Sequence, residues 1–299
     1  MKILLLGSGG QLGAALVGAL GSFAEVTALG RVARTPAGVG LDVGDLGALR
    51  EALRNARPDV VVNASAYTDV DAAERDEERA TRINGEAVGL MGEECRRMRA
   101  GLVHYSTDFV FDGRSARAYR EDDATAPLGA YGRSKLAGER MLAESGAPAL
   151  VLRTAWVYTT WRKSFVSSIL RLAREREALR IVSDQVGNPT FAGDLASVTG
   201  QLLYGMRADP FGAIDAARGV YHVAGGGQAT RFELATAALE LDPRKQEHKV
   251  RKLEPIATSE YPLPAQRPAY APLDCERFRA RFGLALPEWR EALGRALQG

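Results

Sequence analysis

The chain has 299 residues, enough for one large domain or for a domain with a smaller lobe. Hydrophobic residues make up 46% and charged residues 25%, the balance of an ordinary soluble globular protein. The net charge of +2 argues against a strongly basic surface, so we expect no nucleic-acid partner. The first apolar run ends at Gly7, too early for a signal peptide or a membrane span, and Cys95 and Cys275 read as isolated thiols. We therefore expect a cytoplasmic protein with no membrane partner.

Short apolar runs alternate with helical stretches over the first 160 residues. The expected strands cover residues 2–6, 25–29, 59–63, 102–111 and 149–158. The expected helices cover residues 14–20, 45–56 and 129–144, with a charged amphipathic region over 71–99. Strands that alternate with helices at this spacing predict a parallel sheet with helices on both faces.

The pattern loosens after Trp161, where a helix over 164–177 and a late strand over 219–223 are expected. Beyond Lys245, five prolines fall within the eighteen residues 255–272, which excludes a long helix there and indicates loops wrapped over a site. The expected fold class is α/β: a Rossmann-type doubly wound parallel sheet with a smaller, partly irregular C-terminal substrate lobe. We assign the dinucleotide-binding domain to residues 1–160, with the sheet completed by about 179–225. The lobe takes 226–299 with part of 161–178.

A glycine-rich turn follows the first expected strand. In Gly7-x-x-Gly10-x-x-Gly13, the first glycine permits a tight turn and the second lets the backbone approach a pyrophosphate. The third allows the helix to pack closely on the strand, with the helix N-terminus facing the anion. This loop predicts a dinucleotide site that includes Gln11 and Leu12.

The residues after the second strand indicate which dinucleotide binds. An acid there would bind the ribose of NAD, whereas an arginine accommodates the extra phosphate of NADP. The chain has Arg31 and Arg34, with no acid before Asp42. We expect NADPH, with NADH left open, and place Asp42 and Val43 near the adenine at the end of a short third strand.

Tyr131 and Lys135 lie four residues apart on an expected helix and so share one face. A cation beside a tyrosine favours the phenolate and brings the pKa of the phenol toward the working range. Thr107 ends an apolar strand at the sheet edge where ligands bind, and its hydroxyl could hold a carbonyl oxygen. These three residues predict a site that reduces a ketone.

The glycine loop, Thr107, Tyr131 and Lys135 together resemble the extended branch of the short-chain dehydrogenase/reductase superfamily. Further segments narrow the resemblance to the dTDP-4-dehydrorhamnose reductase family. They cover residues 63–74, 106–113, 153–158, 184–190 and 267–274. The resemblance extends from residue 2 to about residue 290.

This resemblance implies hydride transfer from a nicotinamide to the C4 keto carbon of a dTDP-linked 4-keto-6-deoxyhexose. It implies that Tyr131 donates the proton, that Thr107 orients the carbonyl and that Lys135 holds the nicotinamide ribose and lowers the tyrosine pKa. The expected cofactor cleft also includes Ala64, Ser65, Ala66 and Tyr67. The expected substrate site comprises Thr68, Val70, Thr107, Asp108, Phe109, Trp156 and Arg267. Phe109 stands where the family usually has tyrosine.

Several alternatives stay open at this stage. The chain could be another nucleotide-sugar reductase, epimerase or dehydratase of the same branch, although Phe109 replaces the glutamate that a dehydratase needs. It could also be a non-catalytic, NADP-binding regulatory subunit. Some members form dimers bridged by metal-bound carboxylates, but Ala14, Ala15 and residues 191–193 provide no acidic cluster. We therefore expect no metal ligands and either a monomer or a homodimer, with a role for Mg²⁺ left open.

Overall fold

The computed structural model describes residues 1–31 and 40–298. Its main feature is a six-stranded parallel sheet with the order β10-β5-β4-β3-β1-β2. These strands are β1 (Lys2–Leu6), β2 (Glu25–Leu29), β3 (Val60–Asn63), β4 (Gly101–Thr107), β5 (Ala149–Thr154) and β10 (Gly219–His222). From β1 the chain adds β2 on one side and β3 on the other, so the strand order reverses beside β1. Open α/β sheets bind ligands at the carboxyl ends of strands at such a point.

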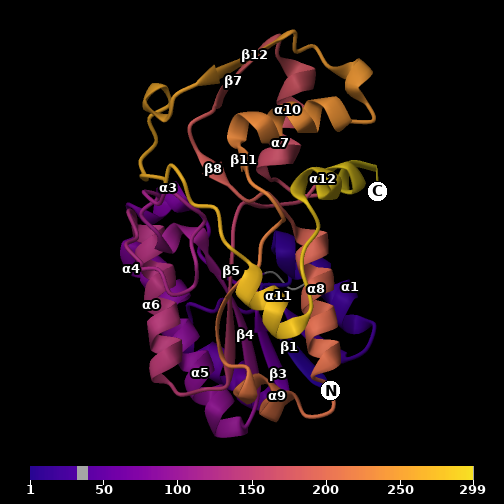
Figure 1. Ribbon diagram of the computed structural model, residues 1–299. Helices are drawn as coiled ribbons and strands as arrows, with labels where there is room; N and C mark the ends of the chain where they lie inside the picture. Colours follow the sequence, from indigo (N-terminus) through magenta and orange to yellow (C-terminus); the bar gives the residue numbers. More distant parts are fainter. Residues whose placement is uncertain (32–39, 299) are drawn as a thin grey trace.

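Helices cover both faces of this sheet (Figure 1). One face carries α1 (Gln11–Gly21), α8 (Ala192–Gly205), α9 (Pro210–Ala216) and α11 (Glu276–Phe282). The other carries α2 (Leu46–Ala56), α5 (Ala87–Met98) and α6 (Ala130–Glu144). Successive strand side chains point to opposite faces, so Ile3 and Leu5 pack in the first core while Leu4 and Leu6 pack in the second. Burial on both faces explains why the inner strands are mainly apolar, whereas the edge strand β2 is largely exposed. The predicted fold class is confirmed.

A smaller lobe lies beyond the carboxyl ends of the sheet strands (Figure 1). It contains the helices α7 (Phe165–Glu175), α10 (Arg231–Leu241) and α12 (Trp289–Gln298), and the short helices η3 (Lys245–Glu247) and η4 (Thr258–Glu260). Its strands form three pairs: β7 (Ala178–Val182) with β12 (Lys252–Ile256), β8 (Val186–Gly187) with β11 (Ala229–Thr230), and β6 (Val157–Tyr158) with β9 (Thr190–Phe191). Of the expected sheet completion over 179–225, β10 joins the central sheet, whereas β7 pairs with β12.

Two expected strands end earlier than their apolar runs. The expected strand over 102–111 stops at Thr107, whose hydroxyl accepts the Phe109 N–H and begins the short helix η2 (Asp108–Val110). The expected strand over 149–158 breaks at Trp156, whose φ is +44°. In both places the backbone turns at the carboxyl edge of the sheet.

Other sequence expectations also need correction. The charged region over 71–99 is four pieces: α3 (Val70–Ala73), α4 (Glu77–Thr81), the π-helix η1 (Arg82–Glu86) and α5. Asp42 and Val43 lie in a turn rather than at the end of a strand, and Arg34 falls outside the described residues. The proline-rich stretch after Lys245 contributes the strand β12 as well as loops.

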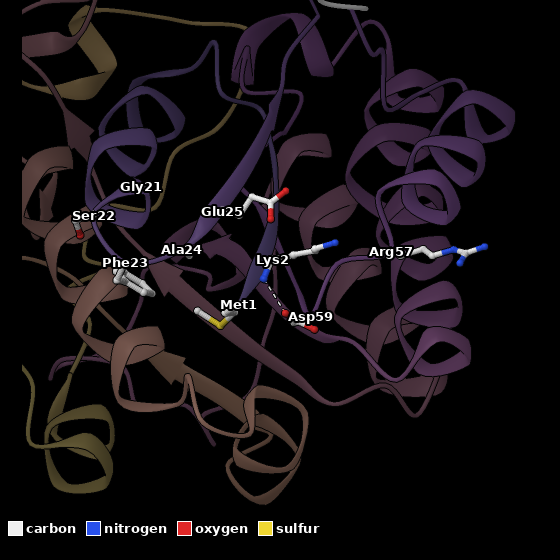
Figure 2. Close-up of a pocket in the computed structure, with 9 residues that line it drawn as sticks. All are labelled: Met1, Lys2, Gly21, Ser22, Phe23, Ala24, Glu25, Arg57 and Asp59. Atoms are coloured by element: carbon white, nitrogen blue, oxygen red, sulfur yellow. Dashed lines mark hydrogen bonds between the residues drawn. The ribbon is translucent and has the colours of Figure 1, made fainter.

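A shallow hollow lies at the opposite, amino-terminal edge of the sheet (Figure 2). It is lined by the starts of β1 and β2 and by the turn before β3, where the backbone N–H of Lys2 donates to Asp59 at 2.7 Å. Because ligands of such sheets bind at the carboxyl ends, this hollow is separate from the site described next. Within residues 1–31 and 40–298, none of the helices combines the length and apolar character needed to cross a bilayer.

Candidate active site

The glycine loop forms a cradle between β1 and α1. Gly7 has φ +84°, and a Cβ there would lie 2.6 Å from the backbone of Ala64. A Cβ on Gly13 would lie 2.1 Å from the carbonyl oxygen of Gly7, so the helix packs directly on the turn. Gly10 caps α1, and the first turn of this helix contains no acid that would neutralise its positive end. Within the described part of the chain, the buried Oε1 of Gln11 has no hydrogen-bond partner. These features suit the pyrophosphate of a dinucleotide.

The edge after β2 has a guanidinium close to Asp42. Arg31 is exposed, and Arg79 of α4 lies 3.9 Å from the Asp42 carboxylate. The same carboxylate accepts the backbone N–H of Gly44 at 2.9 Å. Val43 is buried in the core on the α2 side of the sheet. Sequence reasoning missed Arg79, because it lies far along the chain in a segment expected to be one amphipathic region.

Asn84 holds the loop that follows β3. Its Oδ1 accepts the backbone N–H of Tyr67 at 2.8 Å, and its Nδ2 donates to the Tyr67 carbonyl at 3.1 Å and to Ser134 Oγ at 3.0 Å. Asn84 belongs to the π-helix η1, and such helices often occur at functional sites. It therefore joins the expected cofactor loop over 64–67 to α6, one residue before Lys135. Thr68 and Val70 follow in the same loop, Thr68 exposed and Val70 partly buried.

The expected catalytic residues come together where β4 ends and α6 begins. The backbone N–H of Ala130 donates to Glu74 at 2.8 Å, which anchors the start of the helix. A Cβ on Gly132 would lie 2.3 Å from the Phe109 carbonyl oxygen, so α6 packs directly on the turn after Thr107. This close approach sets the Tyr131 and Phe109 rings edge to face, with centroids 5.5 Å apart. Phe109 therefore packs against the expected proton donor.

Lys135 is 2% exposed, and its side-chain nitrogen lies against β4. Its Nζ donates to the carbonyl of Tyr105 at 2.6 Å and lies 3.2 Å from Nε2 of His104. Burial lowers the pKa of Lys135 to about 8, and the charge of Glu139 opposes this shift. His104, which faces this amine, is fully buried.

The pKa of Tyr131 moves opposite to the sequence expectation. Burial raises this pKa to about 12, the Thr107 hydroxyl partly offsets the rise, and the negative charge of Asp108 adds to it. Lys135 is not among the groups that lower this pKa, and its amine hydrogen-bonds to the carbonyl of Tyr105 on β4. A tyrosine with this pKa is a phenol at neutral pH, so it holds the proton that a reduction must deliver.

Asp108, Trp156 and Arg231 form a second group at the same edge. Asp108 is 2% exposed, accepts the Thr107 hydroxyl at 3.0 Å, and has an Oδ2 that lacks a partner among the described residues. Burial raises the pKa of Asp108 to about 6, whereas the Thr107 hydrogen bond and the Arg231 charge lower it. The Arg231 guanidinium lies 3.5 Å from the centroid of the Trp156 ring. Sequence reasoning missed Arg231, whose position at the start of α10 gave no signal.

Arg267 is placed differently from its expected role. Its guanidinium pairs with Asp71 of α3 at 2.8 Å, and Asp71 also accepts the Ala265 N–H at 3.1 Å. These bonds fasten the proline-rich segment to the larger domain. We expected Arg267 to contact the substrate diphosphate. To do so, its guanidinium would have to leave Asp71 or bind both groups.

A cleft of about 1050 Å³ opens in the small lobe beside this group. It lies between α7, β7, β12 and the proline-rich segment, and it is lined by Gln185, Arg231 and Arg267 among others. Arg231 lines this cleft, and its charge also lowers the pKa of Asp108 at the catalytic edge. In residues 1–31 and 40–298, no group of three or more His, Cys, Asp or Glu side chains is placed to hold a metal ion.

Comparison with known proteins identifies the family. A family model described as the RmlD substrate binding domain matches residues 1–299. The chain belongs to this family. Like other members of the RmlD family, it is an NAD(P)H-dependent oxidoreductase.

Individual relatives match the RmlD-family chain over nearly its whole length. A dTDP-4-dehydrorhamnose reductase of Burkholderia thailandensis is 43% identical, covering 98% of this chain and 97% of the relative. A probable dTDP-4,6-dihydroxy-2-methyloxan-3-one 4-ketoreductase of Streptomyces antibioticus is 38% identical over 99% and 94% of the two chains. The crystal structure of dTDP-4-dehydrorhamnose reductase from Bacillus anthracis in complex with NADP has a TM-score of 0.86 at 28% identity, covering 99% and 98%.

Proposed function

We propose that this reductase uses NADPH to convert dTDP-4-dehydro-L-rhamnose to dTDP-L-rhamnose, with Tyr131 as the proton donor. The observation that carries the proposal is that Tyr131, Thr107 and Asp108 meet at the sheet edge beside the Arg231-lined cleft. The relatives named as dTDP-4-dehydrorhamnose reductases support the substrate, and the neighbour solved with NADP supports the cofactor.

When bound, the dinucleotide supplies a hydride to the C4 keto carbon. The C4 carbonyl oxygen then gains negative charge, and residues of the chain stabilise and protonate it. The Thr107 hydroxyl turns its single proton from Asp108 to this oxygen and holds it. Tyr131, kept as a phenol by its raised pKa, protonates the oxygen. Lys135 provides the nearby positive charge and a donor for the nicotinamide ribose. Thr107 and Lys135 are buried and Tyr131 is partly buried, which limits the competition of water for the developing charge.

The cleft in the small lobe suits a nucleoside diphosphate. Ligand sites of this kind commonly enclose roughly 300–1,000 Å³, and the cleft has about 1050 Å³. Arg231 lies where the diphosphate would pass from the cleft to the catalytic edge, and a guanidinium binds phosphate oxygens in pairs. Trp156 would then form an apolar wall for the deoxyhexose. A Cβ on Gly187 would lie 2.5 Å from this indole, so the glycine fixes its position.

A panel of nucleotide-linked keto sugars tests the proposed substrate. We expect rapid loss of NADPH absorbance with dTDP-4-dehydro-L-rhamnose and at least about tenfold lower kcat/KM with the UDP analogue, because a missing hydrogen-bond or methyl contact costs about 1–3 kcal/mol. The relative named as a ketoreductase of a dTDP-4,6-dihydroxy sugar makes another dTDP-4-keto-6-deoxysugar the second candidate. Higher kcat/KM with that sugar would select it, and cofactor binding without turnover of any sugar would favour a regulatory role.

Arg31 tests the proposed preference for NADPH. An exposed arginine after β2 can pair with the 2′-phosphate, which NADH lacks. We expect Arg31→Ala to raise KM for NADPH by roughly tenfold, the loss of about 1–2 kcal/mol from a charge-assisted contact, and to leave KM for NADH nearly unchanged. Steady-state kinetics with both cofactors measures this. Equal effects on the two cofactors would remove Arg31 from the phosphate site.

A further inference from the structure

Lys135 is one end of a chain of buried polar side chains beneath the catalytic edge. Its Nζ lies 3.2 Å from Nε2 of His104, whose Nδ1 lies 3.0 Å from Nδ2 of Asn63. Oδ1 of Asn63 accepts the backbone N–H of Ser65 at 3.0 Å and its hydroxyl at 2.5 Å. His104 is fully buried, and Asn63 is 1% exposed. The chain therefore connects α6, through β4 and β3, to the expected cofactor loop.

The direction of the hydrogen bonds fixes the tautomer of His104. The backbone N–H of Ser65 can only donate, so Oδ1 of Asn63 must face Ser65 and Nδ2 must face the imidazole. Because Nδ2 can only donate, Nδ1 of His104 accepts and the neutral ring carries its proton on Nε2. Burial and then the nearby Lys135 hold the pKa of His104 well below its ordinary value, so the ring is neutral at neutral pH.

This tautomer presents an N–H to the lysine amine. A neutral amine accepts that N–H with its lone pair and still donates to the Tyr105 carbonyl. An ammonium group would meet Nε2–H with a donor of its own, which is unfavourable in a buried site. On the geometry alone, His104 disfavours the charged lysine.

Other charged groups around Lys135 do not reverse this effect. On α6, Glu139 favours the ammonium form, but its carboxylate is held by Arg153 of β5 at 2.6 Å. Tyr131, one turn earlier on α6, is a neutral phenol. The pKa of Lys135, about 8, is close enough to neutral pH for the lysine to lose its proton in mildly alkaline buffer.

We propose that His104 is a positioning residue whose Nε2–H, fixed by Asn63, favours the neutral form of Lys135 and so makes the lysine lose its charge on mild alkalinisation. The inference rests on the proposed role of Lys135 in ketone reduction. Since the charged lysine holds the ribose and stabilises the oxyanion, kcat/KM falls as pH rises through its pKa.

Asn63→Asp tests the inference by reversing the tautomer. An aspartate accepts from both Ser65 and Nδ1–H, which moves the imidazole proton to Nδ1 and turns the Nε2 lone pair toward the ammonium. We expect the alkaline limb of the kcat/KM profile to move upward by about one pH unit or more. His104→Gln, whose amide oxygen can turn to Nζ, should move the limb in the same direction and covers the case in which the Asn63→Asp protein does not fold.

A measurement without substrate separates this inference from the proposed function. In protein labelled with ¹³C at lysine Cε, the NMR titration of Lys135, assigned with Lys135→Arg, should have a higher midpoint in both variants. In the unaltered protein labelled with ¹⁵N-histidine, the NMR signals of His104 should show that Nε2 carries the proton. Tyr221→Phe, which removes a buried hydroxyl bonded to Ala217 at 2.8 Å, should leave the lysine midpoint unchanged.

Unchanged lysine midpoints in both variants, or a protonated Nδ1 in the unaltered protein, would overturn the role of His104. Raised midpoints support it even if no keto sugar is turned over, in which case the proposed function alone fails.

Discussion

Replacing Tyr131 with phenylalanine is expected to lower kcat by roughly 10²- to 10⁴-fold, because the phenol is the general acid and its removal forfeits that contribution. The packing should persist, since the ring keeps its edge-to-face contact with Phe109. NADPH affinity should change by less than about threefold, because the lysine is retained. Stopped-flow loss of NADPH absorbance and quenching of NADPH fluorescence measure these two quantities.

Tyr221→Phe provides the matched control for Tyr131→Phe. Tyr221 is a buried tyrosine of the same α/β domain, on β10, and its hydroxyl donates to the Ala217 carbonyl away from the site. The control should lose about 1 kcal/mol of stability and keep its kcat. Full turnover by the Tyr131 variant would remove this residue from the chemistry.

Replacing Arg231 with methionine is expected to raise KM for the dTDP-linked sugar by roughly 10- to 100-fold, the cost of losing a charge-assisted contact to phosphate. The kcat should fall less, because Tyr131, Thr107 and Lys135 remain. Since the guanidinium also lowers the pKa of Asp108, its loss should raise that pKa above about 6. Protonation of Asp108 would then persist to higher pH.

Arg207→Met is the control for Arg231. Arg207 also lies over an aromatic ring, 3.7 Å from the centroid of Tyr204, but on the surface beyond α8. It should leave KM unchanged. If Arg231→Met and Arg207→Met give the same KM for the dTDP-linked sugar, the diphosphate site lies elsewhere in the cleft, and Arg267 becomes the next residue to test.

Local patterns in the sequence predicted much of the fold. The glycine loop, the apolar strands and the Tyr131–Lys135 spacing each depend on residues close together along the chain, where backbone geometry alone sets the relative positions. Two predicted strands were too long, and they end at Thr107 and near Trp156. There a side-chain cap and a positive φ stop the strand, although the apolar run continues.

The arrangement of the site was harder to predict than the fold, because it depends on contacts between segments distant in sequence. His104 meets Asn63 across neighbouring strands, and Arg267 meets Asp71 across the two parts of the molecule. Periodicity reports which face of an element is buried and carries no information on which distant side chain it meets. The pKa of Tyr131 illustrates the difference, since the motif predicted a lowered value and burial raised it.

By itself, the sequence determined an α/β dinucleotide-binding fold with a tyrosine and a lysine on one helix face. The alternation of strands with helices and the spacing of the glycines are local patterns, so they can be recognised in the sequence without knowledge of the tertiary structure. Only the tertiary structure decided that Arg231 faces Asp108 and that a fixed imidazole faces Lys135. Burial and hydrogen-bond direction control those charges, and both arise only when segments remote in sequence pack together.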